Sequence, residues 1–360
     1  MNVVAEVRGN LGVITLNRPQ ALNALSLAMV RDITSALLRW RDDATVAAVL
    51  LRGAGREGKP PAFCAGGDIR FFHQAALADD PALEDFFTEE YALNHLIHSY
   101  AKPTIALMDG ITMGGGMGLA QGARLRVVTE HSRLAMPETN IGLFPDVGAG
   151  WFLARCPGRV GEFLALTGQV LGAGDAIHFG LADVYLESAV LPALVEALAD
   201  QPIETAAQAV AAVKARAQTP PAAALAAQRA LIDAHFAHPH ALDVLNALAA
   251  SDSPFARQTA ADLRKRSPLM LAVTLEQVRR ARSMTLADEL RMERNMVHHC
   301  FHQRPGAAGE TVEGIRALAI DKDQQPRWNP ARLEDVQPEQ VAAFFANPWS
   351  PDVHPLRALG

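Results

Sequence analysis

The sequence predicts an α/β fold that continues into a mainly helical C-terminal region. Short continuous apolar runs at residues 46–51 and 104–108 are typical of strands buried on both faces of a sheet. A strand, a glycine cluster and a helix follow one another around Gly66-Gly67 and again around Gly114 to Gly116, which suggests repeated βαβ-type or spiral units. After about residue 185 the chain becomes rich in alanine, which favours helices.

The first elements follow from local sequence patterns. Residues 3–8 and 11–16, separated by Gly9-Asn10, are expected to form a β-hairpin. Ser26 is suited to cap a helix, because apolar residues recur at helical spacing from Val30 onward. Further strands are expected over the two apolar runs and near residues 125–128, and a helix is expected over residues 84–100.

Prolines divide the alanine-rich part into several expected helices. These helices cover residues 203–217, 221–234, 241–250, 270–281 and 286–299. A further short helix is expected after Gln337. Composition therefore predicts a core over residues 1–200 and a mainly helical region over residues 201–360.

Charge and cysteine usage limit the class of protein. The 360 residues carry a net charge of -6, which argues against binding to nucleic acid. No apolar run reaches the roughly 18 residues of a membrane span, and the N-terminal residues lack the pattern of a signal peptide. Three scattered cysteines indicate a reducing, cytoplasmic location. Cys64 is expected to be a buried structural thiol, although its glycine neighbours leave a nucleophile open.

Three carboxylates stand out against apolar surroundings. Glu138 follows a proline in an expected turn, and Asp146 comes eight residues later, before more glycine. Glu90 lies on the apolar stripe of the expected helix 84–100, where burial costs free energy unless the group is paired or has a function. Simpler roles remain open: Glu138 could cap a turn, Asp146 could cap a helix, and Glu90 could meet water at the edge of its stripe.

These segments resemble the enoyl-CoA hydratase/isomerase (crotonase) superfamily and, within it, the 3-hydroxyisobutyryl-CoA hydrolase branch. The matching segments are LNRPQALNAL, AFCAGGDIRFF, FFTEEYALN, KPTIALMDGITMGGGMGL, MPETNIGLFPDVGAG and EGIRALAIDKDQQPRWNP. They span most of the chain, and the last lies beyond the ordinary core of the superfamily. The resemblance implies a crotonase-like spiral of ββα turns that binds acyl-CoA. It implies no cofactor besides the coenzyme A of the substrate.

The resemblance also implies an oxyanion hole made of the backbone N–H groups of Gly67 and Gly115. Two such donors stabilise the charge that develops on a thioester oxygen, and losing one typically costs on the order of 3 kcal/mol of barrier. Neighbouring residues are implied to contact the adenine and pantetheine of coenzyme A: Ala65, Gly66, Asp68 and Ile69. Arg18 and Lys59 are candidates for its phosphates.

Two positions favour the hydrolase branch. The hydratase pattern of this family has one glutamate at the position of Gly118 and another at the position of Glu138. This chain has glycine at the first position, and glycine cannot transfer a proton. Gly118 does not exclude an isomerase that works with a single glutamate at the Glu138 position. Such isomerases, however, usually carry a small residue at the position of Asp146.

The resemblance therefore implies hydrolysis of 3-hydroxyisobutyryl-CoA, a step of valine breakdown, with 3-hydroxypropionyl-CoA as a second substrate. Glu138 is implied to be nucleophile or general base. Asp146 is implied to bind the 3-hydroxyl or orient water, and Glu90 to help hold the hydroxyl end.

Other functions and partners stay open. The chain could be an enoyl-CoA hydratase or isomerase of the same fold, or a non-catalytic protein that binds coenzyme A. No metal site is expected, because His298-His299-Cys300 lacks ligand spacing on one helix face. The expected partner is an acyl-CoA substrate, with neither nucleic acid nor membrane, and association into a homo-oligomer is left open.

Overall fold

The computed structural model describes residues 1–200 and 205–360, so the start of the helix expected from Ile203 lies outside the described residues. Spatial proximity groups the residues into two units made of alternating segments. The first unit comprises Met1–Gly67, Ala92–Ala135 and Val170–Ala226, and the second comprises Asp68–Tyr91, Met136–Gln169 and Ala227–Gly360. The sequence predicts a single boundary after residue 200, because a shift in composition can mark only one point along the chain. It cannot indicate units that are built from alternating segments.

The first unit contains a six-stranded sheet with the order β1-β2-β3-β5-β7-β9, which confirms the expected α/β class. Its antiparallel hairpin has the expected bounds, and the other neighbours pair in parallel. The strands are β1 (Val3–Arg8), β2 (Leu11–Leu16), β3 (Ala48–Gly53), β5 (Thr104–Met108), β7 (Leu125–Val128) and β9 (Val184–Tyr185). Strand β3 begins two residues later than expected, whereas β5 and β7 match their apolar runs.

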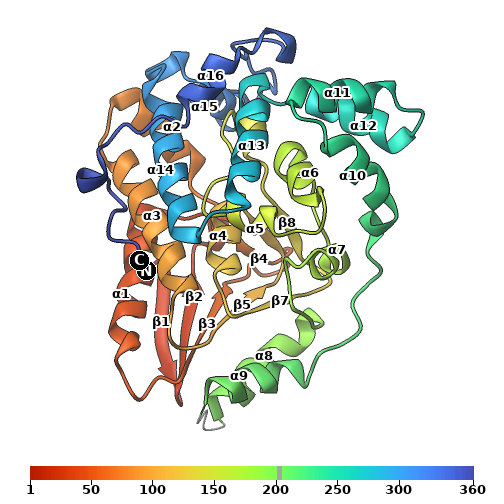
Figure 1. The fold of residues 1–360 in the computed structure, drawn as a ribbon. Helices are drawn as coiled ribbons and strands as arrows, with labels where there is room; N and C mark the ends of the chain where they lie inside the picture. Colours follow the sequence, from red (N-terminus) through yellow and green to blue (C-terminus); the bar gives the residue numbers. More distant parts are fainter. Residues whose placement is uncertain (201–204) are drawn as a thin grey trace. The chain divides into compact units, whose positions relative to one another are not determined.

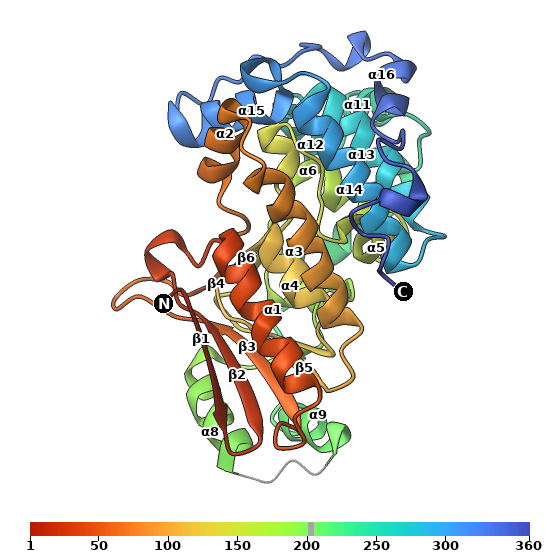
Figure 2. The same ribbon diagram turned by 90° about the vertical axis from the view of Figure 1, so that its left-hand side faces the viewer.

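Helices cover both faces of this sheet, which explains why its central strands are mostly apolar. On one face, α8 (Leu191–Asp200) and α9 (Ala206–Lys214) share an apolar core with the strands. On the other, α1 (Leu27–Arg41) lies along β1 and β2 (Figure 2). A side chain at Gly12 would come within 2.7 Å of the Trp40 ring, so glycine lets α1 approach closely.

A second, three-stranded parallel sheet completes the repeat expected from the glycine clusters. It consists of β4 (Ala62–Cys64), β6 (Ile111–Met113) and β8 (Arg133–Ala135). Along the chain, each of β3, β5 and β7 is followed by one of these strands and then by a helical segment. The segment after β6 is α4 (Gly115–Gln121), which begins at the second glycine cluster. A further helix of the first unit is α7 (Ala173–His178).

The second unit is helical (Figure 1). Its helices are α2 (Ile69–Ala78), the first part of α3 (Ala82–His98), α5 (Ala149–Ala154), α6 (Val160–Thr167), α10 (Arg229–Phe236), α11 (Ala241–Ala250), α12 (Pro254–Leu263), α13 (Pro268–Ala281), α14 (Leu286–His302), α15 (Glu310–Ile315) and α16 (Pro338–Ala343). Among the described residues, no helix is long and apolar enough to cross a membrane.

Two helix predictions need correction. Sequence analysis missed α12, although Ser253 caps it by accepting from the Ala256 N–H and Pro254 occupies its first position. The helix expected over residues 221–234 becomes α-helical only at Arg229, after a short 3-10 segment. Both errors arise near prolines, where a helix start and a helix end carry similar sequence signals.

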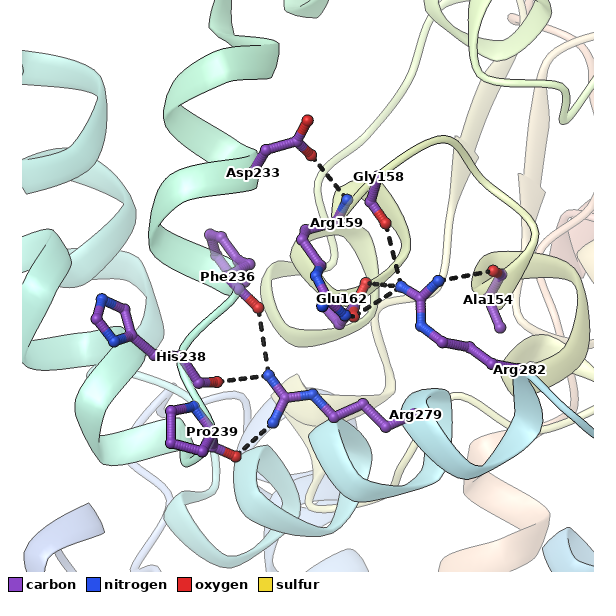
Figure 3. A network of polar contacts seen from close by, with 10 residues as sticks. All are labelled: Ala154, Gly158, Arg159, Glu162, Asp233, Phe236, His238, Pro239, Arg279 and Arg282. Carbon is purple, nitrogen blue, oxygen red and sulfur yellow. Dashed lines mark hydrogen bonds and ion pairs between the residues drawn. The ribbon is translucent and has the colours of Figure 1, made fainter.

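A buried ion-pair network ties three helices of the second unit together (Figure 3). Glu162 of α6 has a fully buried side chain and accepts from Arg159 at 2.8 Å and from Arg282 at 2.8 and 2.9 Å. Arg282, just after α13, also donates to the Gly158 carbonyl at 3.1 Å. Asp233 of α10 accepts from the Arg159 backbone N–H at 2.8 Å.

We expect Glu162→Ala to lower the free energy of unfolding by about 3 kcal/mol, because two guanidinium groups lose a buried partner. Glu276→Ala is the matched control, since the Glu276–Arg280 pair on α13 is exposed and contributes about 0.5 kcal/mol. Denaturant unfolding followed by circular dichroism measures both losses. Equal losses in the two variants would contradict this account of the network.

Candidate active site

The second unit brings together the three carboxyl groups that the sequence singles out. Glu90 lies in α3, Glu138 begins a 3-10 turn directly after Pro137, and Asp146 lies in the loop before α5. Their exposed fractions are 2%, 6% and 5%. Burial and then the charge of Asp146 raise the pKa of both Glu90 and Glu138 well above the usual range, and Glu138 adds to the effect on Glu90. The three groups therefore behave as one electrostatic cluster.

Tyr91 holds Asp146 in place. Its hydroxyl donates to Asp146 Oδ2 at 2.8 Å, and both residues are buried. Burial raises the pKa of Asp146 to about 6, while the hydrogen bond from Tyr91 acts in the opposite direction. The simpler role of Asp146 as a helix cap is wrong, because Gly148 is the N-cap of α5 and Asp146 offers that helix only its backbone carbonyl.

Glu138 and Glu90 each carry a carboxyl oxygen that is buried and has no hydrogen-bond partner among the described residues. Glu138 also accepts a hydrogen bond from a backbone N–H of its own turn, which lowers its pKa, so the role of a turn cap coexists with its unpartnered oxygen. Glu90 is buried and does not meet water at the edge of the α3 stripe. A buried oxygen without a partner costs free energy, as expected of a group that meets a ligand.

A second layer of buried polar residues fixes the loop that carries Asp146. Glu293 of α14 accepts from the Gly148 N–H at 2.7 Å and from the Gly150 N–H at 3.3 Å. Gln277 of α13 donates to the Pro145 carbonyl at 2.7 Å and to Glu293 Oε1 at 2.9 Å. The loop is therefore bonded on both sides of Asp146.

Glu289 lies one turn before Glu293 and is also fully buried. Burial raises the pKa of Glu289 to about 7, and burial together with Glu289 raises that of Glu293 well above its ordinary value. Both buried carboxyl groups therefore hold a proton more tightly than an exposed glutamate does. Sequence analysis missed Tyr91, Gln277, Glu289 and Glu293; two glutamates four residues apart in the apolar pattern of α14 were the available signal.

The first unit brings the two glycine clusters together. Gly66 has a φ of +103°, and a side chain there would come within 3.2 Å of the Met113 carbonyl and 3.5 Å of the Gly115 nitrogen. A side chain at Gly116 would meet the Cys64 carbonyl at 2.2 Å. Only glycine allows this approach. Cys64 is buried, as expected of a structural thiol.

The other residues implied to contact coenzyme A also have structural roles. These roles do not conflict with the predicted contacts to coenzyme A, which stay predictions. Asp68 caps α2 by accepting from the N–H groups of Arg70 and Phe71, and Ile69 is the first residue of that helix. Ala65 donates its N–H to the Leu22 carbonyl at 3.0 Å. Arg18 donates to the Ala24 carbonyl at 3.1 Å, and Lys59 is exposed.

Comparisons with known proteins agree on one family. The family model described as enoyl-CoA hydratase/isomerase matches residues 11–345. The mitochondrial 3-hydroxyisobutyryl-CoA hydrolase of Rattus norvegicus is 41% identical over 98% of this chain and 90% of its own length. The Homo sapiens protein of the same name is 39% identical with the same coverage.

Two solved structures are similar over nearly the whole chain. A carnitinyl-CoA dehydratase from Mycobacterium thermoresistibile matches with a TM-score of 0.87 and 40% identity, covering 96% of each chain. An enoyl-CoA hydratase from Rhodobacter sphaeroides matches with a TM-score of 0.86 and 40% identity, covering 96% of this chain and 97% of the other. The names of these two proteins describe addition or removal of water, whereas those of the curated relatives describe hydrolysis.

Proposed function

Because the chain belongs to the enoyl-CoA hydratase/isomerase family, we propose that it hydrolyses 3-hydroxyisobutyryl-CoA to 3-hydroxyisobutyrate and free coenzyme A. The identity of about 40% with hydrolases of that name, over nearly the whole chain, supports the activity. The observation that carries it is the buried cluster of Glu90, Glu138 and Asp146. Coenzyme A is part of the substrate, and the reaction needs no further cofactor. The reaction is a step of valine breakdown, and 3-hydroxypropionyl-CoA is a second substrate.

In this proposal the backbone N–H groups of Gly67 and Gly115 form the oxyanion hole. They donate to the thioester oxygen and stabilise the negative charge that it gains when the carbonyl carbon is attacked. The close contact of the two glycine clusters supports the role, since donors held by a tight backbone need no reorganisation during the reaction.

Glu138 supplies the attacking group in one of two ways. It attacks the carbonyl carbon itself, releases coenzyme A as a thiolate that takes up a proton, and forms an anhydride that water then opens. Alternatively, it removes a proton from a water molecule that attacks directly. The raised pKa of Glu138 supports the second role, because a carboxylate with a raised pKa is a stronger base than an exposed one.

Asp146 and Glu90 recognise the hydroxyl end of the acyl group. Asp146 accepts from the 3-hydroxyl or orients the attacking water, and Tyr91 supports this role by fixing one of the two Asp146 oxygens. The unpartnered oxygen of Glu90 adds an acceptor. Acyl groups without the hydroxyl leave these buried oxygens unpaired and are therefore poor substrates.

A hydratase or dehydratase activity, which the names of the two similar solved structures suggest, is the second candidate. It needs an additional acid or base, and Gly118 occupies the position implied for one. A non-catalytic protein that binds coenzyme A is the third candidate, and it would leave the buried carboxyl cluster without a role.

One parallel assay separates the three candidates. Free thiol released from 3-hydroxyisobutyryl-CoA is measured beside hydration of crotonyl-CoA on the same sample. Thiol release without hydration supports the hydrolase, and hydration without thiol release overturns it in favour of the hydratase. Binding of the acyl-CoA in calorimetry without either product favours the non-catalytic protein.

A cytoplasmic location stays a prediction, since the names of the curated relatives describe mitochondrial proteins.

Tyr91→Phe tests the role of Asp146. The variant loses a hydrogen bond that lowers the pKa of Asp146, so we expect the low-pH limb of the kcat/KM profile to move from about 6 to a higher value. At pH 7 thiol release is expected to fall about tenfold. Tyr100→Phe, which removes a hydroxyl bonded to the Leu37 carbonyl, is the control. Identical pH profiles for both variants would show that the Tyr91 contact does not matter for turnover.

A further inference from the structure

Three side chains outside the carboxyl cluster converge where α3 and α14 meet in the second unit. Glu84 comes from the first turn of α3, while His298 and His302 lie four residues apart near the end of α14. One ligand atom from each residue lies within 4.8 Å of the other two. His302 Nε2 is 2.9 Å and His298 Nδ1 is 3.5 Å from the same oxygen, Glu84 Oε1.

The distances suit a small dication coordinated by all three groups. Zinc binds nitrogen and oxygen at roughly 2.0–2.2 Å, so two ligands of a tetrahedral ion lie about 3.4 Å apart. The contacts of 2.9 and 3.5 Å fall on either side of that spacing. The imidazole rings of the two histidines are also close, with centroids 4.2 Å apart.

His298 provides a second observation that points to a ligand. Its Nδ1 is buried, and among the described residues its one polar neighbour is Glu84 Oε1 at 3.5 Å, the long limit of a hydrogen bond. A buried ring nitrogen without a partner costs free energy. A shared ion would satisfy it.

The remaining oxygen of Glu84 is held from the other side. The guanidinium of Arg294 pairs with Glu84 Oε2, and its Nε donates to Thr88 Oγ1 at 2.9 Å. Carboxylates that bind metals are commonly oriented by such a partner. Here Arg294 leaves Oε1 facing the two histidines. Its positive charge also opposes a dication, so binding should be in the micromolar range and not tighter.

We propose that Glu84, His298 and His302 form a binding site for one Zn²⁺ ion, with a water molecule as the fourth ligand. Two imidazoles and one carboxylate favour zinc over magnesium or calcium, which prefer oxygen ligands. The side chain of His302 is 40% exposed, which gives the ion access from solvent. The proposal is independent of the proposed hydrolysis.

The ion would join two helices that carry the candidate active site. Glu90 and Tyr91 follow Glu84 on α3, and Glu293 precedes His298 on α14. Zinc would therefore act as a crosslink within the second unit that raises its resistance to unfolding. In the sequence, the adjacent residues His298-His299-Cys300 gave no sign of a metal site. The pair of His298 and His302, one helical turn apart, was missed. Glu84 could not be connected with them from the sequence, because it is 218 residues away from His302.

Calorimetry with zinc chloride tests the site on the full chain after treatment with a chelator. We expect one equivalent of Zn²⁺ to bind with a micromolar dissociation constant, and magnesium chloride to produce no binding heat. His298→Ala, His302→Ala and the double variant should bind at least about 20-fold more weakly, since each removes a ligand. Zinc should raise the unfolding temperature of the unmodified protein but not that of the double variant.

His131→Ala is the matched control. His131 Nε2 lies 3.3 Å from Glu130 Oε1, a histidine–carboxylate pair like the one at Glu84, but among the described residues it forms no group of three ligands. The zinc affinity of the His131→Ala variant should equal that of the unmodified protein. The proposal is overturned if the unmodified protein binds no zinc below millimolar concentration. It is also overturned if the double variant binds zinc with unchanged affinity and stoichiometry.

Discussion

Glu138→Gln is expected to slow thiol release from 3-hydroxyisobutyryl-CoA by about 10³- to 10⁴-fold, because the amide can neither attack the carbonyl nor accept a proton from water. The substitution keeps the shape of a side chain that is only 6% exposed, so folding and acyl-CoA binding should change little. Kinetics at saturating substrate, combined with calorimetric titration of the acyl-CoA, separate turnover from binding.

The control for Glu138→Gln is Glu187→Gln, since Glu187 is an exposed glutamate in the first unit. This control should retain full activity. Rapid quenching of the unmodified enzyme distinguishes the two chemical roles, because it would trap an anhydride only if Glu138 attacks the substrate. Turnover of Glu138→Gln within a factor of a few of the unmodified enzyme would refute the proposed function.

Glu293→Ala is expected to lower both stability and activity, although no role in contacting substrate is assigned to Glu293. The N–H groups of Gly148 and Gly150 lose their buried acceptor, which should cost about 3 kcal/mol of unfolding free energy. The loop that carries Asp146 then loses one of its two anchors. A displacement of about 1 Å at a reacting group can reduce kcat about 10²-fold.

Glu293→Gln separates positioning from a direct chemical role. Burial and Glu289 raise the pKa of Glu293 well above its ordinary value. The amide of glutamine resembles a carboxylic acid in shape and keeps an acceptor oxygen for the Gly148 N–H. We expect this variant to regain most of the stability and activity lost in Glu293→Ala. Thermal unfolding and the steady-state kinetics of the two variants provide the measurement. If Glu293→Ala behaves like the unmodified enzyme, the loop does not depend on this anchor.

The parts of the fold that could be predicted are those with a local cause. The hairpin of β1 and β2 follows from alternating apolar residues around Gly9-Asn10, and α1 follows from a serine cap and a helical stripe. The strands β5 and β7 are mostly apolar because both faces of their sheet are covered. Errors occurred where proline marks either end of a helix, as at α10 and α12.

The candidate site divides in the same way. Glu90, Glu138 and Asp146 could be singled out because each is a carboxylate in an apolar segment and because their segments resemble a known family. The residues that hold these carboxylates in place could not be predicted, because their hydrogen bonds join segments that are far apart in the sequence. Gln277 and the Pro145 carbonyl are 132 residues apart, and Glu293 and the Gly148 N–H are 145 residues apart. No spacing rule connects such positions, and without a structure their burial cannot be known.

The alternating segments of the two units have a consequence for synthesis on the ribosome. The second unit draws on residues 68–91 and 136–169 but is completed only by residues 227–360. Until α14 has left the exit tunnel, Phe87 lacks its contact with Phe301, whose ring centre is 5.7 Å away in the finished protein. We expect chaperones to bind the nascent chain over this period, because Phe87 still lacks one of the contacts that bury it. A chain that stops after residue 226 would keep every segment of the first unit, yet it would lack Gln277 and Glu293, which hold the loop of Asp146.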